Sequence, residues 1–173
     1  MLMETFSGNW IRARTTNSTA SSYAAKIPTL TEPTGAGVWT TDKGGGRIQN
    51  VVTVKPYAIA SDNDTFKMRV IGWNKCDEGT PAAVMWFPTV LVDLALTASA
   101  EVGVAGGVVL GTERFADTMT LTTGNDDVSV DIVSPTGDVS AHAVIDLKGS
   151  QKIEFSFAIV SGATSMNALF KFH

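Results

Sequence analysis

Residues 65–97 constrain the fold of this chain more than any other stretch, because they contain two long strand patterns and two of the four tryptophans. In the first pattern, Phe66, Met68 and Val70 alternate with two basic residues. A period of two is typical of a strand with one buried and one solvated face. A second apolar run follows over residues 84–96, after a turn-rich connection. The stretch therefore predicts two long strands in a β protein.

Two apolar residues break the alternation of the first strand. Ile71 and Trp73 fall on the face of the two basic residues, so we expect that face to be covered by another sheet, another subunit or the N-terminal segment. In the second strand the large side chains share one register: Trp86, Val90, Val92, Leu94 and Leu96. Pro88 has no amide proton to donate to a ladder, which predicts a sheet edge or a bulge there.

Short strand patterns continue to the end of the chain, and no long segment has the helical period. We expect about nine strands, over residues 47–54, 65–75, 84–97, 108–111, 118–122, 128–133, 139–147, 151–160 and 166–172. The late strand alternates clearly, with Ile153, Phe155, Phe157 and Ile159 inward and Lys152, Glu154 and Ser156 outward. Many short strands separated by turn residues predict an all-β fold, an antiparallel β-sandwich or a jelly-roll-like domain.

The first 46 residues differ from the rest, since they are dense in Thr, Ser, Ala, Gly and Pro with isolated large apolar residues. Such a segment has too little apolar surface to order itself and too many aromatic residues for a solvated linker. We expect an extended N-terminal arm over residues 1–46 and a β-sandwich domain over residues 47–173. The arm either packs on its own domain or reaches a neighbouring subunit. In the second case Trp10, Arg12 and Tyr23 bind the partner, because these residue types are enriched at interface hot spots.

Composition narrows the function classes. The chain has 173 residues and one cysteine, Cys76, which excludes an internal disulfide framework and a multi-cysteine zinc site. A formal net charge of −4 argues against a nucleic-acid partner, since phosphate binding needs a basic face. Residues 90–110 are the longest apolar region, but Asp93 and Glu101 interrupt them, so no membrane partner is expected. The N-terminus has no secretory pattern, which leaves a cytosolic assembly compartment as the default.

Residues that support catalysis are sparse. The two histidines, His142 within a strand and His173 at the C-terminus, are too few for a metal site of the cupin type. The sequence contains neither a Gly-x-Ser-x-Gly elbow nor a phosphate-binding loop. We therefore expect no enzyme, no metal and no cofactor.

Two other groups of residues keep more than one interpretation. Two acidic pairs, Asp62 with Asp64 and Asp126 with Asp127, have two interpretations. They are either ligands for calcium or turn residues without a ligand. Three tryptophans are platforms for a sugar or core residues: Trp39, Trp73 and Trp86. For both groups the structural interpretation is the more frequent one in proteins.

Three stretches of the chain support a resemblance. They are the Thr/Gly-rich arm, the segment DTFKMRVIGW followed by MWFPTVLVDLAL, and the C-terminal KIEFSFAIVSGATSMNALFKF. Together they resemble the small β-sandwich structural proteins of tailed bacteriophages, the decoration or cement proteins that bind to capsids. The likeness is one of overall style and includes no single invariant motif.

The resemblance implies a viral structural protein without catalysis. Such a protein binds and stabilises the outside of an assembled phage capsid, usually as a dimer or trimer. Its partner is the major capsid protein, and it is found on the virion capsid surface after assembly in the host cytoplasm. The alternative is a carbohydrate-binding module or phage adhesin, in which exposed Trp and loop Asp or Asn contact sugar. An enzyme with an unusual carboxylate site ranks last.

Overall fold

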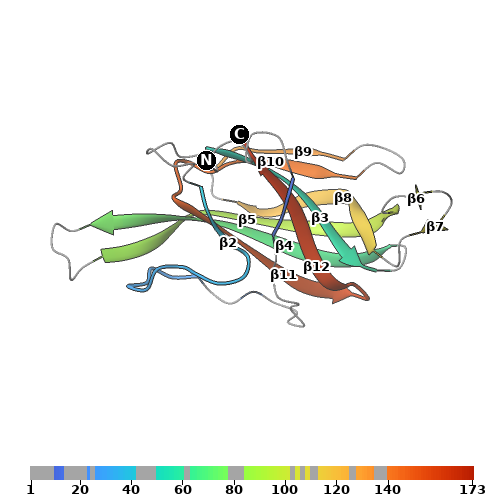
Figure 1. The fold of residues 1–173 in the computed structure, drawn as a ribbon, viewed down its shortest axis with the longest axis horizontal. Helices are drawn as coiled ribbons and strands as arrows, with labels where there is room; N and C mark the ends of the chain where they lie inside the picture. The colour runs from blue at the N-terminus through green and yellow to red at the C-terminus, as the bar shows by residue number, and fades with distance from the viewer. Residues whose placement is uncertain are drawn as a thin grey trace.

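The structure, a computed structural model, contains only β-strands as regular elements in the residues that it describes (Figure 1). The described residues are 10–13, 23, 26–41, 50–60, 63–77, 84–101, 104–105, 108–109, 113–124, 128–134 and 140–173. The strands are β1 (Ile11–Arg12), β2 (Val38–Thr40), β3 (Val51–Ile59), β4 (Asp64–Asp77), β5 (Val84–Glu101), β6 (Val104–Ala105), β7 (Val108–Val109), β8 (Glu113–Gly124), β9 (Val130–Val133), β10 (His142–Asp146), β11 (Lys152–Ser161) and β12 (Thr164–Phe172). The all-β prediction is confirmed.

Ten of these strands form one sheet in which the paired neighbours are antiparallel. Its order is β1-β12-β3-β8-β5-β4-β11-β2, and β10 and β9 branch from β3. The branch arises because the first half of β3 pairs with β10 and its last three residues pair with β8. Strands β6 and β7 form a separate pair. The antiparallel pairing predicted from the short strands and turns is confirmed.

The sheet curls around one large core. Strands β11 and β12 follow each other in the chain but pair with different neighbours, β4 and β3. Their side chains meet across the core, where the rings of Phe155 and Phe170 lie 5.0 Å apart. Figure 1 shows β12 crossing β11 at an angle. The sheet is therefore a curled half-barrel, and the finer assignment to a sandwich or jelly roll stays a prediction.

The alternation predicted for the late strand is confirmed in β11. Ile153, Phe155 and Phe157 are buried in the main core. Their register partners on β4 include Val70 and Met68, which belong to the same core. Paired residues of an antiparallel ladder point to the same side, so β4 and β11 bury one common face.

A bulge between β4 and β5 divides the apolar residues between two faces. Gly72 pairs with Val90 but the next residue, Trp73, pairs with Pro88, so Thr89 is the extra residue. Of the two situations predicted for Pro88, a sheet edge or a bulge, the structure shows a bulge directly beside it. Because one extra residue reverses the alternation, the prediction that Trp86 shares a face with Val90 is wrong. Trp86 instead packs with Ile71 and Trp73 in a second cluster on the outer face.

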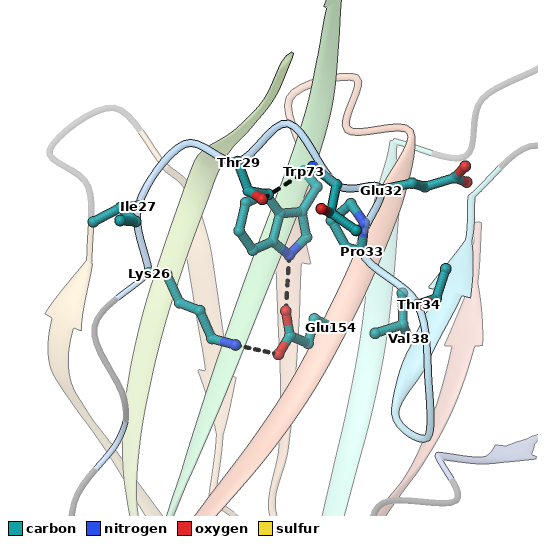
Figure 2. Close-up of a pocket in the computed structure, with 10 residues that line it drawn as sticks. Lys26, Ile27, Thr29, Glu32, Pro33, Thr34, Val38, Trp73 and Glu154 are labelled. Carbon is teal, nitrogen blue, oxygen red and sulfur yellow. Dashed lines mark hydrogen bonds and ion pairs between the residues drawn. The ribbon is translucent and has the colours of Figure 1, made fainter. Parts of the chain in front are cut away.

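The N-terminal segment covers part of this second cluster. We call residues 26–34 the strap, because they cross the outer face of the sheet (Figure 2). The strap is fixed by a two-way backbone bridge between Thr29 and Trp86, with N to O distances of 2.9 and 2.8 Å. Of the three covers expected for this face, the structure shows the N-terminal segment over Trp73.

Two short N-terminal strands lie at the two ends of the sheet order. Strand β1 pairs with β12, and strand β2 pairs with β11. The indole nitrogen of Trp39 on β2 donates to the carbonyl of Ala13, 3.1 Å away, just after β1. The Trp39 ring also packs edge-on against Phe170 at 5.1 Å. These contacts tie the two ends of the curled sheet together, whereas the predicted boundary at residue 46 lies outside the described residues.

Candidate functional site

Two of the three predicted partner-binding residues lie together on one outer face. Trp10 is 40% exposed and lies beside the ammonium of Lys55, which is 4.9 Å from the ring centre. Arg12 is exposed, and its guanidinium lies 5.7 Å from the ring centre of Tyr57. Lys55 and Tyr57 are both on β3, two residues apart, so they point to the same side of the strand.

The same face extends onto β12. Lys171 is opposite Thr53 in the register and Leu169 is opposite Lys55, while the intervening Phe170 belongs to the core. We call the surface made of Trp10, Arg12, Lys55, Tyr57 and Lys171 the basic face. Strands β1, β3 and β12 contain three cationic residues on this face and no Asp or Glu. The chain as a whole has a net charge of −4, so these three strands carry a local excess of positive charge. Acidic residues adjoin the face on β10 and β9, where Asp146 is opposite Val51 and Asp131 is opposite Val144.

Tyr23, the third predicted partner residue, lies elsewhere. Its ring packs over the guanidinium of Arg69 on β4, 4.3 Å from the ring centre. Arg69 donates two hydrogen bonds to Asp93 on β5, at 2.7 and 2.8 Å. The structure therefore places Trp10 and Arg12 over β3 and Tyr23 over β4, and does not bring all three together.

The surroundings of Tyr23 change its acidity. Burial of the phenol, followed by the nearby negative charge of Asp93, raises the pKa of Tyr23 well above its ordinary value, while Arg69 opposes this in part. The hydrogen bonds to Asp93 raise the pKa of Arg69, so this guanidinium stays charged. The Tyr23 hydroxyl is buried and makes no hydrogen bond to any described residue.

Sequence reasoning missed Lys55, Tyr57 and Lys171 as members of the basic face. A signal for two of them was present, because the stretches around Lys55 and Lys171 lack acidic residues and place each lysine at an outward position of an alternating strand. Their proximity to Trp10 and Arg12 was not visible, since β1 is only two residues long and has no periodicity of its own.

A hollow beneath the strap is the second candidate site. Its volume is about 390 Å³. Figure 2 shows the strap arching around it, with Trp73 at the floor and the Glu154 side chain beside Lys26. Glu154 accepts a hydrogen bond from the Trp73 indole at 2.9 Å and forms an ion pair with Lys26 at 2.6 Å. A carboxylate with both oxygens engaged is therefore held in a fixed orientation at the hollow.

The far side of the strap is fastened by Lys152. Its ammonium lies 2.5 Å from a carboxylate oxygen of Glu32 and donates to the carbonyl of Pro33 at 2.9 Å. It also lies 5.5 Å from the ring centre of Trp86. Together with the pair of Lys26 and Glu154, this gives two cations and two anions around the strap, so the local charges balance.

Within the described residues, the remaining candidates from the sequence do not form a catalytic or metal-binding cluster. Within the described chain, no three His, Cys, Asp or Glu side chains are grouped to hold a metal ion. Cys76 is exposed on β4 and forms no disulfide. His142 is half-buried on β10, and the ring of His173 lies 2.9 Å from the Thr53 hydroxyl.

The acidic pairs and the three tryptophans each had two interpretations in the sequence. Asp64 begins β4, and the other three acidic residues, Asp62, Asp126 and Asp127, lie outside the described residues. Trp73 and Trp86 are 3% and 7% exposed and belong to the outer cluster, and the Trp39 indole is bonded to a backbone carbonyl. Buried rings cannot stack on a sugar, so the structure supports the core interpretation for Trp73 and Trp86.

Comparisons with known proteins give no relative on which an assignment could rest. The chain matches no protein-family model, no curated protein and no solved structure. Among the described residues, none belongs to a helix of the length and apolar character needed to cross a membrane. The function of the chain therefore has to be inferred from the two sites alone.

Proposed function

We propose that the protein is a non-enzymatic structural protein of a bacteriophage, a decoration or cement protein that binds and stabilises the outside of an assembled capsid. Its body is a β-sandwich or jelly-roll-like domain, and its partner is the major capsid protein. It acts as a dimer or trimer on the virion surface, without nucleic acid, membrane or cofactor. The observation that supports this most is the basic face, where Trp10 and Arg12 are exposed beside Lys55.

The basic face suits a partner surface that is acidic and has an apolar centre. Trp and Arg are enriched among residues that dominate binding energy, and Trp10 supplies an exposed aromatic ring beside the ammonium of Lys55. Complementary charge raises the association rate and fixes the orientation of the partners. The main contribution of this face is therefore the specific recognition of an acidic surface on the capsid subunit.

Stabilisation follows from burial at a joint between subunits. A specific interface buries about 1,200 to 2,000 Å² in total, which increases the free energy needed to separate the subunits it bridges. A protein that binds only the assembled shell stabilises the shell by linkage. Repetition over the capsid surface multiplies a modest individual contact.

Co-sedimentation with shells assembled from the major capsid protein tests the proposal. Wild-type protein should sediment in a fixed ratio to the shell subunit. The double variant Arg12→Glu with Lys55→Glu should lose at least about tenfold in affinity, because it reverses two of the three charges of the basic face. The control Lys148→Glu reverses a charge in an exposed turn and should bind as wild type does.

The absence of any binding of the wild-type protein to shells would contradict the proposal. Binding that the double variant retains in full would contradict it as well. Binding of the wild-type protein to DNA with the same dependence on Arg12 and Lys55 would assign the basic face to nucleic acid instead. A monomer in sedimentation velocity, both free and shell-bound, would contradict the proposed dimer or trimer.

A further inference from the structure

The hollow beneath the strap has the dimensions and the preorganisation of a small-ligand site. Its volume of about 390 Å³ lies within the range of roughly 300 to 1,000 Å³ that is usual for such sites. The Glu154 carboxylate is oriented by the Trp73 indole on one oxygen and by Lys26 on the other. Each carboxylate oxygen has a second lone pair, so Glu154 can still accept a hydrogen bond from a ligand.

The charges around the hollow indicate what kind of ligand it would take. The pairs Lys26 with Glu154 and Lys152 with Glu32 leave no net charge. An anion would meet Glu154 and a cation would meet Lys26, so neither is favoured over the other. A hydroxyl group both donates and accepts, and two adjacent hydroxyls can therefore donate to a carboxylate and accept from an ammonium at once.

The rest of the lining fits the same chemistry. Thr31 and Thr34 are exposed residues of the lining, whereas Ile27, Pro33 and Val38 provide apolar contact. Figure 2 shows Thr34, Ile27, Pro33 and Val38 around the hollow. Polar groups beside small apolar surfaces match a sugar ring, which has hydroxyls around its edge and C–H groups on its faces. Because Trp73 is only 3% exposed, it orients Glu154 and does not act as a stacking platform.

We propose that the strap hollow binds a neutral saccharide. Glu154 accepts a hydrogen bond from one hydroxyl, Lys26 donates to a neighbouring one, and Ile27 and Pro33 contact a C–H face of the ring. Without an aromatic platform the affinity for one site is low, with a Kd of about 1 mM. This site is separate from the basic face and does not depend on capsid binding.

Titration of the full-length protein with neutral sugars tests the proposal. The probes are glucose, galactose, mannose, N-acetylglucosamine and their short oligomers, and the readout is the chemical shift of the Trp73 indole proton. At least one of these sugars should shift this resonance in a saturable way. The proposal is overturned if none of these sugars binds in a saturable way.

Variants separate the hollow from the rest of the surface. Thr34→Trp fills the rim without removing the contacts of Glu154, and Glu154→Gln removes the charge that pairs with Lys26. Each should weaken sugar binding at least about tenfold, a loss of about 1.4 kcal/mol. The control Asp131→Asn removes a carboxylate on exposed β9, away from the hollow lining, and should bind as wild type.

Folding and capsid binding provide independent checks on these variants. If Glu154→Gln lowers the melting temperature, the Thr34→Trp variant still decides the question, because the Thr34 side chain is exposed. Sugar binding that both variants retain would place the ligand elsewhere and overturn the proposal. Shell co-sedimentation should be unchanged in Thr34→Trp. Failure of the sugar site would therefore show only in the sugar titration, and failure of the capsid proposal only in the co-sedimentation of the wild-type protein.

Discussion

An aromatic residue such as Tyr23 can bind a partner or pack on its own domain. As an aromatic residue in a polar segment it was expected to bind a partner, but in the structure its ring covers Arg69 on its own sheet. The stacked guanidinium is held in turn by Asp93. These contacts stabilise the docked segment, and exchanging them for a partner would expose the Arg69–Asp93 pair to solvent.

We expect Tyr23→Phe to keep or slightly increase stability at neutral pH, by up to about 1 kcal/mol, because it removes a buried hydroxyl with no hydrogen bond to any described residue. The folded state raises the pKa of Tyr23 above its ordinary value of 10.0, so this residue's contribution is fully present below about pH 10 and is lost as pH rises further. Urea unfolding across that range should therefore show a smaller alkaline loss in the variant. An identical alkaline loss in both proteins would contradict the raised pKa.

Gly72 is required by packing at the bulge. A Cβ at this position would lie 2.9 Å from the Cβ atoms of Ser150 and Val90 and closer still to the Ser150 hydroxyl oxygen. Ser150 is fully buried and donates to the carbonyl of Leu147 at 2.6 Å, so it cannot move away easily.

Gly72→Ala should therefore lower the free energy of unfolding by about 1 to 3 kcal/mol, the usual cost of overpacking. Urea unfolding measures it. The matched control Thr120→Ala, on an exposed position of β8, should stay within about 0.5 kcal/mol of wild type. Equal stability of the two variants would show that the bulge accommodates a methyl group.

At the scale of elements, the N-terminal segment has two structural tasks. The strap lies over Trp73 and is bridged to Trp86, and the short strands β1 and β2 tie the ends of the sheet together. Short edge strands and a covering loop also limit edge-to-edge pairing with other chains. Removal of residues 1–46 would therefore affect the stability of the domain as well as partner binding, which is why point variants are the better test of function.

Trp39→Phe tests the tie between β2 and the end of β1. The ring contact with Phe170 can persist, while the hydrogen bond to the Ala13 carbonyl is lost. We expect a loss of about 1 kcal/mol in unfolding free energy. Amide exchange of Ala13, which donates to Ala168 at 2.9 Å, should accelerate more than exchange in the central strands. Unchanged exchange at Ala13 would mean that Trp39 does not tie this seam.

The whole molecule combines a negative net charge with one basic face. The formal net charge of the chain is −4, whereas the three cations of the basic face attract an acidic surface. This asymmetry gives the molecule a preferred orientation towards a partner. Because of this asymmetry, the salt dependence of binding can identify the interface without a structure of the complex.

Affinity for shells should fall as salt rises from about 0.05 to 0.5 M, because the Debye length shortens from well over 10 Å to about 4 Å. In the Arg12→Glu and Lys55→Glu double variant, the remaining affinity should depend much less on salt. Co-sedimentation at several salt concentrations measures both. A wild-type affinity that does not change with salt would exclude the basic face as the contact.

Most of the longer strands and the buried face of β11 followed from the sequence, because the alternation of side chains is a local property of an extended chain. The prediction of about nine strands was too low for the described residues, which form twelve: β1, β2 and β6 were missed, and β3 runs over Val51–Ile59 instead of residues 47–54. Three features depended on the tertiary structure. One extra residue at Thr89 moved Trp86 to the outer face, since a bulge reverses the alternation. Pro88 indicated an edge or a bulge, but only the register with β4 decided which of the two it is. The strap and the pairing of β1 join residues far apart in the chain, and only the folded register brings Arg12 to Tyr57 and Glu154 to Lys26.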